Sequence, residues 1–361
     1  MTKAVILENK DTKRVVSPTY NYIFNKNTGF FARWGKTKED DPTFSPFGPE
    51  IADIEISTVC SGVDGVGVCK FCYKSNTPKG DNMSIDTFKK VFNNLPRTVT
   101  QIAFGIGNLP NHVHGGNPDM WAIFDYCNDN GVKPNVTVNG QGVDDETADR
   151  LSKTCGGVAV SVYDKDISYD AIKKLTDRGM ENVNIHFMIC EQTFDKAKEV
   201  INDVATDERL KNLHALVLLS LKPHGRGKNT YYTHLPQDKF NELVDYSLEK
   251  KIPIGFDSCS AIKSMYAFEN KPNYDQILQS IEPCESTLFS MYINTDGIYF
   301  PCSFMEGEDV ENGGDWTSGI DLTKDNLDFL KDVWYNEKTR DFRHKCITCR
   351  ETKISCSHYT I

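Results

Sequence analysis

A regular alternation of short β-rich runs and amphipathic helical stretches fills the middle of the chain, from residue 51 to residue 257. The β-rich runs are expected over 51–57, 100–105, 135–139, 157–162, 183–189, 213–221 and 252–257. The helical stretches are expected near 84–95, 117–131, 144–154, 168–179, 193–206 and 237–250. Strands that alternate with helices at this rhythm pair in parallel through right-handed crossovers. The pattern therefore predicts an α/β chain, either an open doubly wound sheet or a full or partial βα barrel.

The alternation is absent at both ends of the chain. Near the N-terminus, an aromatic segment predicts a β-hairpin that turns at Asn27-Thr28-Gly29. Near the C-terminus, the run 290–302 predicts a second hairpin that turns at Asp296-Gly297, and a helix is expected near 324–336. We therefore expect three parts, namely a hairpin extension (1–50), a partial barrel (51–260) and a small C-terminal module (261–361).

The composition of the chain bears on its core, its partners and its cellular location. Hydrophobic residues make up 39% of the chain, which is enough for a buried core. Asp and Glu outnumber Lys and Arg by 51 to 41, and the net charge of −10 argues against a general nucleic-acid coat protein. No run of about eighteen apolar residues exists, so no membrane helix is expected. Because the N-terminal segment also lacks a signal-peptide cleavage site, we expect a cytoplasmic protein.

Three cysteines follow the first expected strand directly, at Cys60, Cys69 and Cys72. Twelve cysteines in a long chain without an export signal favour metal binding or redox chemistry over disulfides. Three converging thiolates can hold three irons of a [4Fe–4S] cluster and leave the fourth iron open for a ligand. A zinc site is the alternative, but no Cys or His follows closely enough to complete it. The glycines that would let the loop wrap a cluster are Gly62, Gly65 and Gly67.

This cysteine segment resembles the signature of the radical SAM superfamily, which has a three-residue gap and then a two-residue gap with an aromatic residue before the last cysteine. The chain keeps Cys69-Lys70-Phe71-Cys72 but has eight residues in the first gap. The resemblance spans residues 50–257 and implies a partial (β/α)6 TIM-like barrel in which S-adenosylmethionine (SAM) binds the open iron. It also implies reductive cleavage of SAM to methionine and a 5′-deoxyadenosyl radical that abstracts hydrogen. The electron would come from an external donor of the flavodoxin or ferredoxin type.

The resemblance also assigns a SAM pocket to residues at the ends of successive strands. Phe71 would pack near the adenine, and backbone groups between Phe104 and Asn108 would approach the methionyl amine. Asn108 stands where an acid is common in the family. Arg226, in a stretch that resembles the family's Pro-x-Gly-Arg, would pair with a carboxylate of SAM or of the substrate. The implied cofactor-binding residues are Phe71, Phe104, Gly105, Gly107, Asn108, Asn139, Ser161 and Arg226.

Five cysteines near the C-terminus form a second set. Their spacing is similar to the SPASM/twitch extension of radical SAM maturases, which implies one auxiliary [4Fe–4S] cluster in a module built from a β-hairpin and a helix. A structural zinc site of four cysteines is the alternative. The spacing leaves open which four of the five would bind iron. The set consists of Cys284, Cys302, Cys346, Cys349 and Cys356.

Two further residues are candidates for catalysis, because both follow the last expected strand and would face the barrel mouth. The Cys259 thiol is a candidate hydrogen-atom donor, and the Asp257 carboxylate is a candidate acid or base. His186 lies in the middle of a strand and is interpreted as a residue that lines the barrel. Buried, inert thiols are expected at Cys127, Cys155 and Cys190.

Two functions follow from the resemblance, and a third belongs to a different class. The first is radical modification of a peptide or protein side chain by an oxidoreductase or transferase of the maturase type. The second is the same chemistry on a nucleotide, a DNA base or another small metabolite, because the whole chain also resembles uncharacterised radical SAM proteins encoded by bacteriophages. The third is a zinc-stabilised binding module without catalysis, which the barrel alternation and the strand-end glycines oppose.

Overall fold

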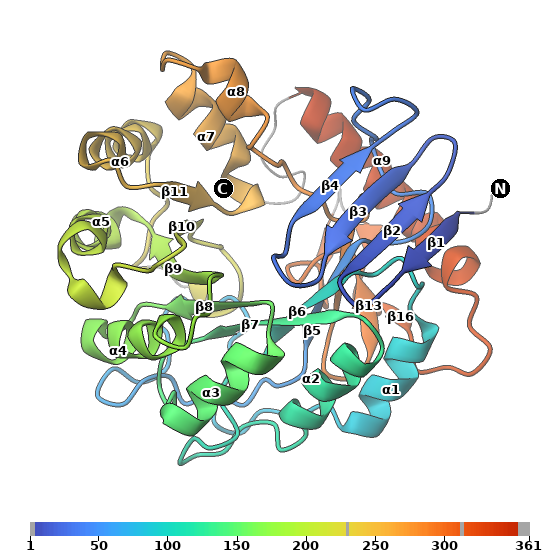
Figure 1. Ribbon diagram of the computed structural model, residues 1–361, viewed down its shortest axis with the longest axis horizontal. Coiled ribbons are helices and arrows are strands. Elements are labelled where there is room, and N and C mark those ends of the chain that lie inside the picture. The colour runs from blue at the N-terminus through green and yellow to red at the C-terminus, as the bar shows by residue number, and fades with distance from the viewer. Residues whose placement is uncertain (1–3, 229–230, 311–313, 353–361) are drawn as a thin grey trace.

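The computed structural model describes residues 4–228, 231–310 and 314–352. Within these residues, a ten-stranded sheet runs in the order β11-β10-β9-β8-β7-β6-β5-β12-β13-β16 (Figure 1). All neighbouring strands from β11 to β12 pair in parallel. This confirms the predicted α/β partial barrel. Its strands are β5 (Ile51–Glu55), β6 (Gln101–Gly105), β7 (Lys133–Val138), β8 (Gly157–Ser161), β9 (Val183–Ile189), β10 (Ala215–Ser220) and β11 (Ile254–Phe256).

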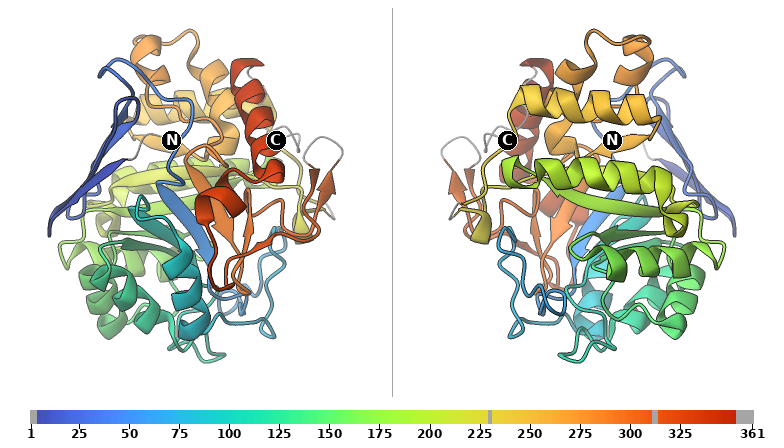
Figure 2. Two further views of the ribbon diagram at one scale, coloured as in Figure 1. Left: turned by 90° about the vertical axis from the view of Figure 1, so that its right-hand side faces the viewer. Right: turned by 90° about the vertical axis from the view of Figure 1, so that its left-hand side faces the viewer.

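Helices cover the outer face of this sheet (Figure 2). They are α1 (Ile85–Asn94), α2 (Met120–Asp129), α3 (Asp145–Thr154), α4 (Lys165–Thr176), α5 (Phe194–Thr206) and α6 (Gln237–Lys250). Several begin at a capping side chain. Ser84 accepts a hydrogen bond from the Thr87 N–H at 3.1 Å, and Asp144 accepts one from the Thr147 N–H at 2.8 Å. These caps satisfy backbone donors that the first turn of a helix leaves free, and so they set where the helices start.

Alternation along each strand separates the hydrophobic core from the inside of the barrel. In β9, Val183, Ile185, Phe187 and Ile189 are buried in the core, whereas the intervening Asn184, His186 and Met188 face the other way. In β5, Ala52 and Ile54 belong to the core, and Asp53 and Glu55 lie on the opposite face. Successive side chains of a strand point to opposite faces, so the polar residues line the inside of the barrel, hereafter the lumen.

The N-terminal extension is a four-stranded antiparallel sheet, made of β1 (Val5–Glu8), β2 (Thr12–Val16), β3 (Asn21–Asn25) and β4 (Phe31–Trp34). The predicted hairpin is confirmed as β3–β4, and the β1–β2 hairpin was not predicted. Lys13 Nζ donates to the Val99 carbonyl at 2.8 Å, and the Tyr22 hydroxyl donates to the Thr98 carbonyl. The sheet is therefore fastened near the start of β6, on the side of the molecule opposite the segment that follows β5 (Figure 2).

The C-terminal hairpin extends the barrel sheet. Its first strand, β12 (Ser290–Ile293), pairs in parallel with β5, and β13 (Ile298–Phe300) returns antiparallel to it. The predicted turn is confirmed, with Gly297 at φ +79°. The remaining strands, β14 (Asp309–Val310), β15 (Gly314–Asp315) and β16 (Ile320–Asp321), are two residues long.

Helical structure around this hairpin differs from the expectation. Helices α7 (Ala261–Phe268) and α8 (Tyr274–Leu278) precede it. The helix expected near 324–336 is only a π-helical turn at Phe329–Trp334. The cysteine-rich end of the chain instead forms α9 (Glu337–Thr352), which was not predicted as a helix. Among the described residues, no helix is long and apolar enough to cross a membrane.

Arg343 of α9 anchors the C-terminal part to the rest of the core. Its buried guanidinium donates to the Thr287 carbonyl at 2.6 Å and to the Trp334 carbonyl at 2.8 Å. The same group lies 4.8 Å from the centre of the Phe44 ring. Because both carbonyls are buried beside this cation, they depend on it for their hydrogen bonds.

We expect Arg343→Met to lower the free energy of unfolding by about 2–4 kcal/mol, since two buried carbonyls would lose their donors. Urea denaturation followed by circular dichroism measures this loss. Arg340→Met, on an exposed position of the same helix, is the matched control and should change stability by less than about 0.5 kcal/mol. Equal losses in the two variants would contradict the anchoring role.

Candidate functional site

The three cysteines after β5 lie on a tightly folded loop. Cys60, Cys69 and Cys72 are partly exposed free thiols. The Gly67 N–H donates to the Val63 carbonyl at 2.7 Å and closes a turn inside the loop. The glycines predicted to shape this loop all have left-handed backbone angles, which glycine adopts without strain: Gly62 at φ +79°, Gly65 at φ +78° and Gly67 at φ +76°.

Two amides predicted to bind the cofactor hold the first half of this loop. The buried Asn108 side chain accepts from the Ser61 N–H at 3.1 Å and donates to the Ser61 hydroxyl at 3.0 Å. Asn139, after β7, donates to the Gly62 carbonyl at 3.0 Å. The segments that follow β6 and β7 therefore hold the loop where it begins, at the neighbouring residues Ser61 and Gly62. The structure brings these residues together at the predicted strand ends.

Gly107 allows the end of β6 to pack directly against the cysteine loop. It has φ +58°, and a Cβ atom placed there would overlap the Val59 carbonyl oxygen. The Gly105 carbonyl accepts a hydrogen bond from the Ile56 N–H at 2.8 Å. Phe104 differs from the expectation for a pocket residue, because its ring is stacked on Phe124 at 4.9 Å in the core. Only its backbone reaches the strand end.

Arg226 holds the second half of the loop. It lies in a 3₁₀ turn at Gly225–Lys228, and its Nε donates to the Cys69 carbonyl at 2.9 Å. Its Nη1 donates to the Asn76 carbonyl at 3.0 Å, and its backbone N–H donates to the Cys72 carbonyl at 3.0 Å. The guanidinium expected to pair with a carboxylate therefore binds backbone carbonyls around two of the cysteines. Sequence spacing contains no signal for such long-range contacts.

Burial raises the pKa of the Cys60 thiol and raises that of Cys69 to about 11, although a hydrogen bond with Tyr163 and the Arg226 charge act on Cys69 in the opposite direction. In the described part of the chain, no three His, Cys, Asp or Glu side chains are placed to hold a single metal ion. A [4Fe–4S] cluster takes one thiolate at each of three irons, so its ligands need wider spacing than a single ion requires. The thiols of Cys60 and Cys72 both act electrostatically on Cys69, so the three groups lie near one another around the glycine-rich loop.

An aromatic wall borders the loop. The Phe71 ring lies 6.0 Å from the Tyr163 ring and 5.4 Å from the Tyr232 ring. Ser161, at the end of β8, hydrogen-bonds Tyr163, which in turn hydrogen-bonds Cys69. Ser161 thus reaches the cysteine loop through Tyr163, a residue that the sequence analysis did not select. The position of Tyr163, two residues after the end of β8, was the signal in the sequence that could have identified it as a site residue.

A charged pair links the two candidate catalytic residues. The Lys222 ammonium forms an ion pair with Asp257 and a hydrogen bond with Cys259. Burial acts to lower the pKa of Lys222, but the Asp257 carboxylate and the Cys259 thiol raise it overall, so the amine stays protonated. Ser260, in the 3₁₀ turn that follows β11, also donates to Asp257. Lys222 is a site residue that sequence reasoning missed.

The segment 303–308, which follows Cys302, reaches the same region from the C-terminal hairpin. The Phe304 ring lies 4.8 Å from that of Tyr73, next to Cys72. Glu306 pairs with Lys74, and Glu308 lies 2.8 Å from His224. The hairpin therefore contributes side chains to the region around the cysteine loop.

The second cysteine set is brought together between the hairpin and α9. Cys284 and Cys346 are hydrogen-bonded, and this bond with Cys346 is the main reason why the pKa of Cys284 falls to about 6. Tyr299 interacts with both Cys302 and Cys346, and Cys349 lies one helical turn after Cys346. Cys356 lies outside the described residues. Four of the five predicted cysteines thus come from segments that meet.

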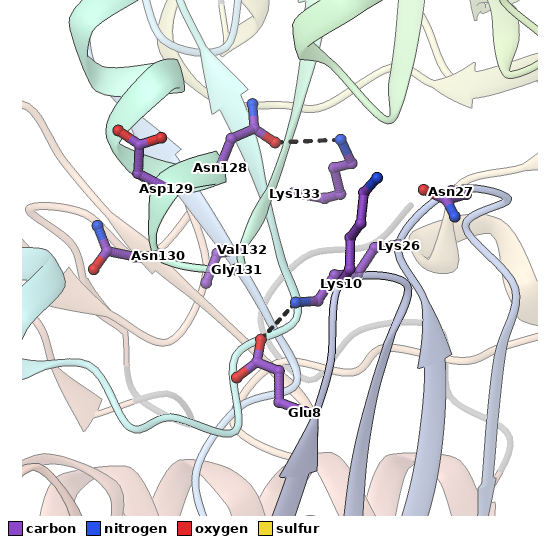
Figure 3. A pocket seen from close by; sticks show the side chains of 10 residues that line it. All are labelled: Glu8, Lys10, Lys26, Asn27, Asn128, Asp129, Asn130, Gly131, Val132 and Lys133. Atoms are coloured by element: carbon purple, nitrogen blue, oxygen red, sulfur yellow. Dashed lines mark hydrogen bonds and ion pairs between the residues drawn. The ribbon is translucent and has the colours of Figure 1, made fainter.

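The three thiols expected to be inert, Cys127, Cys155 and Cys190, are all buried. A separate hollow of about 570 Å³ lies among Glu8, Lys10, Lys26 and the start of β7 (Figure 3). Asn139, which binds the cysteine loop, lies beyond the other end of β7. This hollow is therefore remote from the candidate site.

We expect Gly107→Ala to destabilise the cysteine loop, because the new methyl group would overlap the Val59 carbonyl oxygen. Gly115→Ala is the matched control, since Gly115 also has a positive φ but no atom lies within 4 Å of a Cβ there. After anaerobic reconstitution, the Gly107 variant should bind less than about half of the wild-type iron, whereas the control should stay near wild type. Equal iron content would contradict the packing role of Gly107.

The buried His186 side chain should make the free energy of unfolding depend on pH. Burial in the barrel lowers its pKa to about 4, although the Asp257 carboxylate partly opposes this shift. The His186 imidazole therefore binds a proton more readily in the unfolded chain than in the folded one. The free energy of unfolding should fall as the pH is lowered from about 6.5 toward 4, with a loss of about 1–2 kcal/mol at pH 5. Urea titrations at pH 7.5 and pH 5 should show a smaller acid loss for His186→Gln than for wild type. The exposed His344→Gln is the control, and an unchanged loss in the His186 variant would refute the assignment.

No family model matches the chain, and no curated protein matches its sequence. Solved structures do match. SuiB from Streptococcus suis, bound to precursor peptide SuiA, has a TM-score of 0.65 at 12% identity over 94% of this chain and 90% of that chain. The enzyme anSMEcpe with bound AdoMet, which is SAM, has a TM-score of 0.55 at 13% identity over 84% of this chain and 83% of that chain. The resemblance to phage-encoded proteins finds no support in these comparisons. The matching structures are radical SAM enzymes with SPASM-type domains, and this chain has their fold.

Proposed function

We propose that the chain is a radical SAM enzyme, with Cys60, Cys69 and Cys72 as the ligands of a [4Fe–4S] cluster and SAM at the open iron. The observation that carries the proposal is the cysteine loop itself. Its backbone is fastened by the ends of β6 and β7 and by Arg226, while its three thiols stay partly exposed. This arrangement occurs on the fold of an enzyme solved with bound AdoMet.

A reduced [4Fe–4S] cluster would supply the electron that cleaves SAM to methionine and a radical able to abstract hydrogen. The residues of this chain prepare the place for that event. Asn108, Asn139 and Arg226 hold the loop so that the thiols keep their positions. Phe71 and its aromatic neighbours Tyr163 and Tyr232 exclude water and offer ring faces to the adenine.

Asp257 and Cys259 are proposed to act on the substrate. Lys222 binds both, which keeps the carboxylate and the thiol at one strand-end position. The carboxylate oxygen would accept a proton released from the substrate. Where the product requires it, the thiol would give a hydrogen atom to the substrate radical and become a thiyl radical, which one electron from the external donor and one proton would return to the thiol. Lys222 touches neither reacting atom in this scheme and is a positioning residue.

A second part of the proposal concerns the C-terminal module (261–361), which follows the hairpin extension (1–50) and the partial barrel (51–260). Cys284, Cys302, Cys346 and Cys349 are proposed to hold one auxiliary [4Fe–4S] cluster. The support is that Cys284 bonds Cys346 and that Tyr299 interacts with both Cys302 and Cys346. Cys356 would then be the fifth, spare cysteine.

The proposed substrate is a peptide or protein side chain, modified by an oxidation or a group transfer. SuiB was solved with a precursor peptide and anSMEcpe with the Cp18Cys peptide, which supports a peptide for this chain also. A cytoplasmic flavodoxin or ferredoxin is the proposed external electron donor. It would deliver single electrons to the cluster.

The first test is 5′-deoxyadenosine formation. We expect the anaerobically reconstituted protein, reduced with dithionite and mixed with SAM, to form this product. The triple variant Cys60→Ala, Cys69→Ala and Cys72→Ala should form less than about one hundredth as much, since the open iron would be lost. Mass spectrometry of the nucleoside measures both.

Iron counting separates the two clusters. Wild type should hold about eight irons, and the triple variant should keep the auxiliary cluster and hold about four. Cys155→Ala, which removes a buried core thiol, is the matched control and should hold about eight. Absence of 5′-deoxyadenosine from protein with full iron content would refute the proposed function.

A further inference from the structure

Arg226 carries a positive charge beside the cysteine loop that the protein does not balance with a carboxylate. Its guanidinium donates to two backbone carbonyls, that of Cys69 at 2.9 Å and that of Asn76 at 3.0 Å. Among the residues that the structure describes, no Asp or Glu side chain lies within ion-pair distance of it. The side chain is half-buried, so water compensates its charge only in part. A guanidinium in such a position gains from an anion placed next to it.

Acids that reach the same region already have cationic partners. Glu308 lies 2.9 Å from Lys228 Nζ and 2.8 Å from His224 Nε2. Glu55 lies 3.1 Å from Lys74 Nζ. The charges of these acids are therefore offset by their own neighbours, and the charge of Arg226 is left over.

Two glycines let the turn that carries Arg226 pack against the cysteine loop. Gly225 has φ +53°, and a Cβ atom there would lie 2.1 Å from the Tyr73 carbonyl oxygen. A Cβ atom at Gly227 would meet another backbone carbonyl oxygen at 2.3 Å. Between them, the Arg226 backbone N–H donates to the Cys72 carbonyl at 3.0 Å. Close backbone packing thus fixes the place of the guanidinium.

The charge of Arg226 also acts on the sulfur atoms. Burial raises the pKa of the Cys60 and Cys69 thiols, and Arg226 opposes this rise at both. A nearby cation has this effect because it favours the thiolate over the neutral thiol. The same preference applies to any other anion that these cysteines hold.

A [4Fe–4S] cluster at these cysteines would be such an anion. Three thiolates outweigh the positive charge of the oxidised cluster core, and one-electron reduction adds a further negative charge. A fixed cation therefore stabilises the reduced form more than the oxidised form. The reduction potential of the cluster should rise with the positive charge beside it.

We propose that Arg226 is the countercharge of the cluster bound by Cys60, Cys69 and Cys72, and that it raises the potential at which this cluster accepts an electron. This inference rests on the proposed function, because it takes a cluster at the three cysteines as given. Arg226 contacts neither SAM nor substrate in this scheme and is a positioning residue that acts through the cluster. Its charge makes the cluster easier for the external donor to reduce.

Two substitutions separate the charge of Arg226 from its hydrogen bonds. Arg226→Lys keeps the charge, whereas Arg226→Gln removes it and can still donate to a carbonyl. Redox titration followed by electron paramagnetic resonance measures the midpoint potential of the full-length, anaerobically reconstituted protein. The triple cysteine variant, which should hold only the auxiliary cluster, identifies the signal of each cluster.

We expect Arg226→Gln to lower the equilibrium constant for one-electron reduction about tenfold, a shift of about 59 mV to lower potential. Arg226→Lys should stay within about threefold of wild type. Lys228→Gln is the matched control, because this exposed lysine lies in the same turn but is paired with Glu308. It should change the constant by less than about twofold. The auxiliary cluster is the internal reference, and its potential should stay the same in all three variants.

Circular dichroism and iron content show whether each variant is folded and loaded, and the potential can be read from partly loaded protein. An unchanged potential in Arg226→Gln would overturn the proposal. An equal fall in Arg226→Lys would also overturn it, since the hydrogen bonds and not the charge would then matter. Loss of the cluster from both variants would assign Arg226 to holding the loop alone, with the same consequence. A cluster kept by Arg226→Lys and lost from Arg226→Gln would support the countercharge.

Formation of 5′-deoxyadenosine separates this inference from the proposed function. If wild type forms the nucleoside while Arg226→Gln keeps the wild-type potential, the countercharge is refuted and the proposed function stands. If the potential shifts as expected but no sample forms the nucleoside, the radical chemistry is refuted and the countercharge stands.

Discussion

The parallel pairing of β5 with β6 on one side and β12 on the other is the interaction on which the rest of the structure depends. The first pairing places the cysteine loop at the same edge as the ends of β6 and β7, from which Asn108 and Asn139 bind it. The second pairing brings the C-terminal hairpin beside the barrel, so that the segment 303–308 reaches Tyr73 and Lys74. Because β5 also carries Asp53 and Glu55, one short strand joins the cysteine loop, the lumen and the second cysteine set.

Contacts to backbone carbonyls, more than contacts among thiols, shape the cysteine loop. Arg226 binds the carbonyls of Cys69 and Asn76, and Asn139 binds that of Gly62. Such contacts fix the path of the chain while leaving the sulfur atoms available for a metal. Burial keeps the Cys60 and Cys69 thiols protonated, so a cluster must displace those protons as it binds.

Much of the barrel could be predicted because its strands carry a local signal. In β9, buried apolar side chains alternate with mostly polar ones, and each of the strands predicted in the barrel lies within two residues of its observed bounds. The turn at Gly297 and the left-handed glycines of the cysteine loop were likewise predictable, because only glycine adopts such angles without strain. The β1–β2 hairpin was missed, since Val5 and Leu7 are exposed and give no core pattern. Helix α9 was missed because its sequence is largely polar and its cysteines were considered only as ligands.

The amino-acid sequence was sufficient to predict the strand–helix order and to place three cysteines and several polar residues at the ends of strands, because these properties depend on periodicity and neighbouring residues. It could not show that Phe104 lies in the core, that Arg226 binds the cysteine loop, or that Lys222 joins Asp257 to Cys259. Nor could it show that Glu55 is held by Asn76, Lys74 and Tyr292. Those outcomes depend on which side chains from distant segments meet across the barrel, and the packing of the whole chain sets those distances.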